Sequence, residues 1–116
     1  MTFLGLDIGT SAVKAVLVDE AHALLAEAEL ALPIARPRPL WSEQDPADWW
    51  SATRAVLASL RAQRPDALRE VRALGLSGQM HGAVLLDSAD RVLRPAILWN
   101  DGRAQAECRL LEQRVP

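Results

Sequence analysis

Three runs of apolar and β-branched residues open the chain and predict three consecutive β-strands. Residues 2–8 form a buried run with a single acid, bounded by Gly-Thr-Ser at residues 9–11. Residues 12–19 are again apolar and β-branched, so we expect them to pair antiparallel with the first run. After a polar turn, residues 24–32 predict a third strand, although their Ala-Glu repeats are also compatible with a helix.

The pattern changes to a helical period after a proline-rich connection. Three prolines within residues 33–39 predict extended chain, because each fixes its own φ and lacks an N–H donor. Asp45 before Pro46 is typical of a helix start, and Asp48 adds charge near the positive end of the helix dipole. Residues 64–66 either end that helix or begin a short second one. The helix carries an apolar stripe formed by Trp49, Trp50, Thr53, Val56, Leu57 and Leu60.

The last third of the chain predicts further strands and a final helix. Residues 71–76 form an apolar run, and residues 83–86 and 92–99 flank a polar turn. Asp101 is expected to cap a last helix. The apolar stripe of that helix is formed by Ala104, Cys108, Leu111 and Val115, in which Cys108 would be an inert core residue. The order of elements predicts a layered α/β fold without the regular strand–helix alternation of a Rossmann domain.

Composition narrows the possible functions. The chain has 116 residues, of which 50% are hydrophobic and 24% are charged, and its net charge is −2. These values are ordinary for a globular domain and give no reason to expect a nucleic-acid partner. Cys108 is the only cysteine, which excludes an intrachain disulfide and a zinc cluster. We find no leader and no apolar stretch of the ~18–20 residues that a membrane span needs. We therefore expect a cytoplasmic protein without a membrane partner.

The first candidate site is the turn after the first strand. Asp7 would end a buried strand, where an acid is unfavourable unless a metal or hydrogen bonds compensate it. Gly9 allows a sharp turn, and Thr10 and Ser11 add hydroxyl and amide donors. Such a turn can hold the terminal phosphates of ATP, with Asp7 directed at the bridging Mg²⁺. A strand-ending turn with a local hydrogen bond to Asp7 explains the same residues. The glycine spacing matches neither a Walker A loop nor the dinucleotide fingerprint.

The second candidate site is the sequence Gly-Gln-Met-His-Gly at residues 78–82, directly after a predicted strand. Its two glycines allow a small ligand to approach the backbone closely. Gln79 and His81 can donate to or accept from hydroxyl groups, and Met80 offers an adaptable apolar surface. These properties suit a polyol. The alternative is a solvated or structural histidine in an ordinary loop.

The third candidate site lies within residues 97–103. Trp99 could stack on the C–H face of a sugar, while Asn100, Asp101 and Arg103 could bind its hydroxyls. The alternative is that Trp99 is a core residue and that the polar residues are structural. We expect Trp99 near the substrate, and a structural role for the other three. The tryptophans within residues 41–50 are explained by packing of the linker and the helix.

The turn Asp-Ile-Gly-Thr-Ser at residues 7–11 resembles the first phosphate loop of sugar kinases, actin and the heat-shock ATPases. In that superfamily a strand ending Asp-x-Gly-Thr opens a ribonuclease H-like domain. Trp-Ser-Glu-Gln-Asp-Pro at residues 41–46, Gly-Gln-Met-His-Gly and Leu-Trp-Asn-Asp-Gly-Arg at residues 98–103 extend the resemblance over essentially the whole chain. The chain thereby resembles the FGGY carbohydrate kinases, and among them the bacterial xylulose kinases. Glycerol kinases carry an Arg-Glu pair in place of Met80 and His81.

The resemblance implies ATP- and Mg²⁺-dependent phosphorylation of D-xylulose to D-xylulose 5-phosphate. It implies that Asp7 serves the metal–phosphate side. The residues implied at the phosphates are Gly9, Thr10, Ser11 and Lys14, and those implied at the sugar are Gln79, Met80, His81 and Trp99. Family members are several times longer, and their catalytic base and adenosine pocket would lie beyond Pro116. We therefore expect residues 1–116 to be an incomplete first kinase domain, inactive alone and prone to self-association, with a homodimer in the complete enzyme.

Three other functions remain open at this point. An FGGY kinase for a different ketose, polyol or sugar acid would differ only in its sugar contacts. A non-catalytic, actin- or chaperone-like ATP-binding module would share the Asp-x-Gly-Thr turn but has no reason to keep the loop at residues 78–82. A regulatory sugar-binding protein would bind D-xylulose without ATP.

Overall fold

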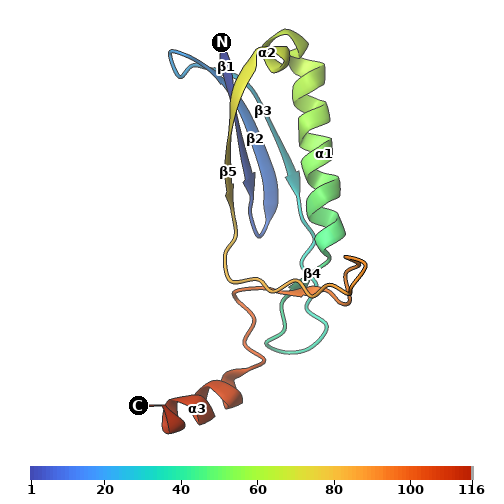
Figure 1. The fold of residues 1–116 in the computed structure, drawn as a ribbon, viewed down its shortest axis with the longest axis vertical. Helices are drawn as coiled ribbons and strands as arrows, with labels where there is room; N and C mark the ends of the chain where they lie inside the picture. The colour runs from blue at the N-terminus through green and yellow to red at the C-terminus, as the bar shows by residue number, and fades with distance from the viewer. Residues whose placement is uncertain (116) are drawn as a thin grey trace.

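The computed structural model describes residues 1–115 and contains a four-stranded mixed sheet with a long helix along one face (Figure 1). The strand order is β3-β2-β1-β5, in which the β1–β2 and β2–β3 pairs are antiparallel and the β1–β5 pair is parallel. The strands are β1 (Thr2–Ile8), β2 (Ala12–Asp19), β3 (Leu24–Ala31) and β5 (Val71–Gly78). The strands predicted from the apolar and β-branched runs and the antiparallel pairing of the first two are confirmed, and residues 24–31 form the third strand.

Helix α1 (Pro46–Gln63) covers the sheet and forms the core with it. Its start is the predicted one, because the Asp45 carboxylate accepts a hydrogen bond of 2.9 Å from the Ala47 N–H and Pro46 occupies the first turn. Every second residue of β2 faces the helix, as the pleat of a strand requires. The largest fully buried apolar side chains of the core are Val13, Leu17, Val56 and Leu60. A short helix, α2 (Pro65–Arg69), then leads into β5.

A second, smaller layer lies at the end of the sheet where β1 and β5 finish (Figure 1). It consists of β4 (Glu43–Gln44) paired antiparallel with β6 (Ala96–Ile97). The strands predicted for residues 83–86 and 92–99 are reduced to the two residues of β6 and to two isolated bridges, Leu86 with Val92 and Ala83 with Ile97. Pro95 lies directly before β6 and has no N–H to donate, which limits the pairing.

The last helix, α3 (Gln105–Arg114), differs from the prediction in two respects. It begins after Ala104 without a side-chain cap, so the predicted cap by Asp101 is wrong. It also buries none of its residues, and Cys108 and Leu111 are exposed, so the predicted core stripe is wrong for this chain. The reason is that α3 lies beyond the second layer, away from the sheet (Figure 1).

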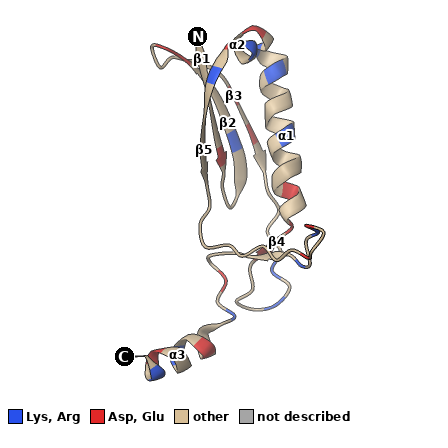
Figure 2. Ribbon diagram, in the orientation of Figure 1, with Lys and Arg blue, Asp and Glu red and all other residues tan. Residues whose placement is uncertain are grey.

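The outer edge of β5 is exposed, and the face of the sheet away from α1 is partly exposed. Leu74 and Leu76 on β5 are 52% and 69% exposed. Charged residues of both signs are interspersed along the ribbon (Figure 2). Within residues 1–115, no helix combines the length and the apolar character needed to cross a membrane.

Candidate functional site

Two of the three predicted motifs lie at adjacent strand ends. Because β1 and β5 are parallel, with Asp7 opposite Ser77 and Ile8 opposite Gly78, both strands finish at the same end of the sheet. The Gln79 N–H donates to the Ile8 carbonyl at 2.9 Å and continues the pairing beyond β5. The β1–β2 turn (residues 9–11) and the β5 loop (residues 79–82) therefore face the same region, as expected for ligand-binding loops in α/β folds.

The β1–β2 turn is tight and carries unused donors. The Gly9 N–H donates to the Ala12 carbonyl at 3.0 Å, and a Cβ on Gly9 would lie only 3.1 Å from that carbonyl oxygen. An Asp7 carboxylate oxygen lies 3.5 Å from the same position, so the acid is next to the turn. Among the described residues, the N–H groups of Thr10 and Ser11 donate to no protein acceptor. A turn with free N–H groups beside a carboxylate fits a phosphate that carries a divalent cation.

Side-chain hydrogen bonds join the turn to the other two motifs. The Thr10 hydroxyl donates to Gln79 Oε1 at 3.1 Å and accepts from Trp99 Nε1 at 3.0 Å. Trp99 is 56% exposed, so the alternative that it is a core residue is wrong. Gln79 Nε2 in turn donates to Gln44 Oε1 at 3.1 Å. The three motifs predicted from the sequence are therefore parts of one hydrogen-bonded site.

The β5 loop presents its side chains to solvent on a strained backbone. Met80 is 60% exposed, and His81 is exposed with a φ of 60°. A left-handed conformation costs a non-glycine residue about 1–2 kcal/mol, and such residues are enriched at functional sites. The loop borders a hollow of about 370 Å³, a size that suits a small ligand. The hollow is lined by Ile8, Trp49, Leu76, Ser77, Gly78, Gln79, His81 and Gly82.

A second hollow, of about 490 Å³, is bordered by the proline-rich segment 36–42 and by Asn100. It contains none of the residues predicted to bind phosphate or sugar. Because Gln79 and His81 line the hollow at the β5 loop, we assign the sugar side of the site to that hollow rather than to this larger one.

Lys14 is not brought to the β1–β2 turn. It lies opposite Asp7 in the β1–β2 register, on the face of the sheet away from α1. Its ammonium group pairs with the Glu29 carboxylate at 3.2 Å, and both side chains are more than half exposed. Binding of ATP phosphates by Lys14 would require this exposed ion pair to open, and this role stays a prediction.

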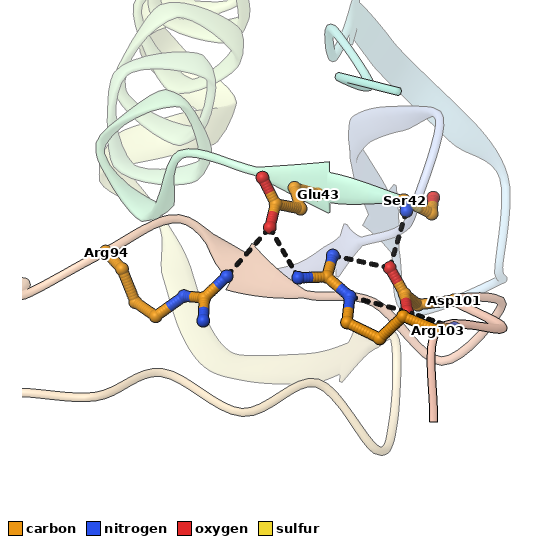
Figure 3. A network of polar contacts seen from close by, with 5 residues as sticks. All are labelled: Ser42, Glu43, Arg94, Asp101 and Arg103. Carbon is orange, nitrogen blue, oxygen red and sulfur yellow. Dashed lines mark hydrogen bonds and ion pairs between the residues drawn. The ribbon is translucent and has the colours of Figure 1, made fainter. Parts of the chain in front are cut away.

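An ionic cluster built around two buried carboxylates, those of Glu43 and Asp101, holds the segment that carries Trp99 against β4 (Figure 3). The Asp101 carboxylate accepts from the Ser42 N–H at 2.6 Å and forms two side-chain hydrogen bonds with Arg103, at 2.6 and 2.8 Å. The guanidinium of Arg103 also pairs with Glu43 at 2.9 Å, as does that of Arg94.

The ion pair between Asp101 and Arg103 stabilises the charged form of both side chains. Hydrogen bonds from Arg103 hold the pKa of the Asp101 carboxyl far below its usual range, although burial opposes this shift. The same hydrogen bond raises the pKa of Arg103. Arg103 also lies over the ring of Trp41, 3.6 Å from its centroid. The structural role expected for Arg103 is confirmed, whereas Asp101 does not cap a helix and instead binds the Ser42 N–H and Arg103.

The N-terminal domain of the FGGY family of carbohydrate kinases matches residues 2–115. The chain belongs to this family. Over 114 residues it is 54% identical to the xylulose kinase of Escherichia coli strain K12. The aligned segment covers 98% of this chain and 23% of that protein. It is 42% identical over 105 residues to the xylulose kinase of Bacillus subtilis strain 168, covering 90% of this chain and 21% of the relative.

Solved structures of FGGY kinases have the same fold. A xylulose kinase from Brucella ovis matches with a TM-score of 0.93 and 52% identity, covering 98% of this chain and 24% of the other. A xylulose kinase from Rhodospirillum rubrum matches with a TM-score of 0.90 and 37% identity, covering 99% and 24%. The expected ribonuclease H-like fold of the sugar kinases is therefore confirmed. The chain spans about 23% of the length of the E. coli relative.

Proposed function

We propose that this chain supplies the N-terminal part of an ATP-dependent D-xylulose kinase, which makes D-xylulose 5-phosphate. The observation that carries the proposal is the hydrogen bond between Thr10 in the β1–β2 turn and Gln79 in the β5 loop. A kinase must hold the phosphoryl donor and the acceptor hydroxyl in line, and most of its catalysis comes from this positioning and from charge neutralisation. Two loops of different ligand chemistry, joined by a direct hydrogen bond, suit that requirement.

On the ATP side, Asp7 and the N–H groups of Thr10 and Ser11 would hold the phosphates with Mg²⁺. Mg²⁺ commonly takes one or two protein carboxylates and completes its coordination with water and phosphate oxygens. A single carboxylate beside free N–H groups fits such an ion, which would neutralise charge on the phosphates. The part of these residues is to orient the phosphate chain toward the β5 loop.

On the sugar side, Gln79, Met80, His81 and Trp99 would bind D-xylulose. The amide and imidazole groups can hydrogen-bond hydroxyls, whereas Met80 and the exposed face of Trp99 offer apolar contact to C–H groups. The xylulose kinases among the relatives support this sugar over glycerol. An FGGY kinase acting on a different ketose is the second candidate, because the same loop chemistry would serve any small polyol.

We further propose that the catalytic base and the adenosine pocket lie in sequence that the longer relatives have beyond the matching segment. The chain spans 23% of the E. coli relative. Asp7 would serve the phosphates and so would not be available as the base. Residues 1–116 alone are then inactive and prone to self-association through the exposed edge of β5. A cytoplasmic location, a homodimer of the complete enzyme and the absence of nucleic-acid and membrane partners stay predictions.

A chimeric enzyme tests the proposal. In it, this chain replaces the matching segment of the E. coli xylulose kinase. ADP release is measured with D-xylulose, D-ribulose and glycerol for the chimeric enzyme, for the E. coli enzyme and for the 116-residue chain. We expect the chimeric enzyme to turn over and to prefer D-xylulose, and the 116-residue chain to be silent. A folded chimeric enzyme that binds D-xylulose but releases no ADP would instead favour a sugar-binding protein. Preference for another sugar would favour the second candidate.

A further inference from the structure

We propose that Gln44 is a positioning residue that fixes the β1–β2 turn relative to the β5 loop. This inference rests on the proposed function, in which the two loops hold the two substrates. Gln44 lies in β4, more than thirty residues from Thr10 and from Gln79 in sequence. Nothing in the local sequence pattern distinguishes it from the polar residues around it.

The side-chain amide of Gln44 uses its full hydrogen-bonding capacity. Its Nε2 donates to the Thr10 carbonyl at 2.7 Å and to the Pro33 carbonyl at 3.1 Å. Its Oε1 accepts from Trp49 Nε1 at 2.9 Å and from Gln79 Nε2 at 3.1 Å. An amide has two N–H donors and two acceptor lone pairs, and here all four are engaged. The residue is only 2% exposed, so water does not compete for these bonds.

Two of these hydrogen bonds close a ring with the hydrogen bond between Thr10 and Gln79. Gln44 donates to the backbone of Thr10, the Thr10 hydroxyl donates to Gln79, and Gln79 donates back to Gln44. A single hydrogen bond between two loops permits rotation about it, whereas a closed ring fixes both distance and orientation. The ring therefore holds the backbone of the predicted phosphate turn and a predicted sugar ligand in one geometry.

Gln44 is itself anchored on both sides. The preceding residue, Glu43, forms ion pairs with Arg94 and Arg103, and the following residue, Asp45, caps α1. Gln44 also pairs with Ala96 in the β4–β6 ladder. Because the backbone on either side is fixed, the Gln44 amide is held in place. It can therefore fix the positions of the two loops, which follow the C-terminal ends of β1 and β5.

A positioning role and a merely structural role predict different kinetics. Each loop keeps its own ligand contacts when the ring is broken, so the KM values for D-xylulose and ATP should change little. The relative placement of the two substrates matters most in the transition state, where a misplacement of 1 Å can lower the rate by about 100-fold. Loss of the ring should therefore lower kcat. A structural role would lower the melting temperature and leave kcat unchanged below it.

The test uses Gln44→Met, which keeps the side-chain length and removes all four hydrogen bonds, and Gln44→Glu, which keeps the acceptor and removes both donors. Both are made in the chimeric enzyme, with Gln63→Met as the matched control. Gln63 also bridges α1 to a neighbouring strand, by donating to the Glu27 carbonyl at 2.9 Å, but lies outside the ring. At a temperature where the proteins are folded, we expect kcat to fall about tenfold or more for both Gln44 variants, with KM values within about threefold. Gln63→Met should stay within about twofold of the reference.

A second readout is independent of catalysis. In the chimeric enzyme, the indole N–H of Trp99 is expected to donate to Thr10 as it does in this chain, with no hydrogen bond to Gln44. If Gln44 positions the turn, Gln44→Met shifts the Trp99 indole resonance in a ¹H–¹⁵N spectrum, while Gln63→Met does not. The Trp99→Phe variant identifies that resonance.

The outcomes separate this inference from the proposed function. If the reference chimeric enzyme released no ADP but Gln44→Met still shifted the Trp99 resonance, the kinase function would be contradicted. The contact between Gln44 and the β1–β2 turn would then still be supported. An active reference whose folded Gln44 variants keep kcat within about twofold would overturn the positioning role alone. An unmoved Trp99 resonance, or unfolding of both Gln44 variants at the assay temperature, would also overturn it.

Discussion

The indole Nε1 of Trp99 donates to the hydroxyl of Thr10 at 3.0 Å, across 89 positions of sequence. That hydroxyl donates its own proton to Gln79, so its orientation is set by protein groups on both sides. The donors that the β1–β2 turn has left for a phosphate are therefore the backbone N–H groups of Thr10 and Ser11 and the Ser11 hydroxyl. Thr10 accordingly has two roles in our account, since its side chain joins the motifs while its backbone faces the ligand.

The first prediction concerns this hydroxyl. In the chimeric enzyme, Thr10→Val removes the bonds to Gln79 and Trp99, whereas Thr10→Ser keeps a hydroxyl that can form both. We expect Thr10→Val to lower kcat/KM by roughly 10–100-fold, because one positioning contact is lost on each side of the site. Thr10→Ser should stay within about threefold of the reference. Equal losses in steady-state ADP-release assays of the two variants would show that the hydroxyl is not the important group.

The second prediction uses the two histidines of the chain, which share one backbone conformation. His81 has a φ of 60° and His22, in the β2–β3 turn, has a φ of 63°. Glycine relieves left-handed strain but adds freedom to the unfolded chain, so each His→Gly change should stabilise by roughly 0.5 kcal/mol. Urea unfolding of the 116-residue chain measures this stability.

Only one of the two changes should affect the reaction. In the chimeric enzyme, His81→Gly is expected to raise the KM for D-xylulose about tenfold, and His22→Gly to leave it unchanged. The comparison separates strain from ligand contact, because the strain is common to both. If the KM for D-xylulose were the same in both variants, the proposed sugar contact of His81 would be wrong.

The third prediction concerns acid stability. The pKa of Asp101 is lowered in the folded chain, mainly by hydrogen bonds from Arg103. A depressed folded pKa stabilises the protein fully above the unfolded value of about 3.9, and this contribution is lost as the pH falls toward the folded value. Asp101→Asn should therefore lower the urea midpoint at pH 7. The difference in urea midpoint between this variant and the unsubstituted chain should become smaller below about pH 4.5.

Asp66 provides the comparison for that experiment. A hydrogen bond from Arg64 lowers the pKa of Asp66 to about 2, but its side chain is 66% exposed. Asp66→Asn should lower the urea midpoint only slightly, and added salt should remove this difference, because exposed ion pairs are screened. The effect of Asp101→Asn should persist in salt, since the Asp101 side chain is 2% exposed. If the urea midpoints of Asp101→Asn and the unsubstituted chain differed by the same amount from pH 7 to pH 3, the ionised Asp101 carboxylate would not stabilise the fold as proposed.

Features with a local cause could be predicted from the sequence. The first two strands follow from their apolar and β-branched runs and from the turn at Gly9, and the start of α1 follows from Asp45 and Pro46. The motifs at residues 9–11 and 79–82 could be placed at strand ends for the same reason. Their convergence could not, since it depends on the parallel pairing of β1 with β5.

Features with a distant cause were missed. Asp101 has the sequence context of a helix cap, yet its carboxylate is engaged by Ser42 and Arg103, which a local pattern does not reveal. Gln44 entered the sequence analysis only as part of the motif at residues 41–46, because the local pattern does not reveal its contacts with Thr10, Trp49 and Gln79. The apolar stripe of α3 was expected to be buried, but the helix lies away from the sheet and buries none of its residues.

The most direct test of the whole account is the D-xylulose-dependent kcat of the Asp7→Asn chimeric enzyme, measured beside Asp19→Asn. Asp19 ends β2 at the other end of the sheet, where its carboxylate accepts from the N–H groups of Ala21 and Ala23. We expect Asp7→Asn to lower kcat by roughly 100-fold or more, because the charge that faces Mg²⁺ and phosphate is lost, without lowering the melting temperature. Asp19→Asn should retain kcat. If Asp7→Asn kept full activity, Asp7 would only end a strand, and this chain would not contribute the phosphate site that the account requires.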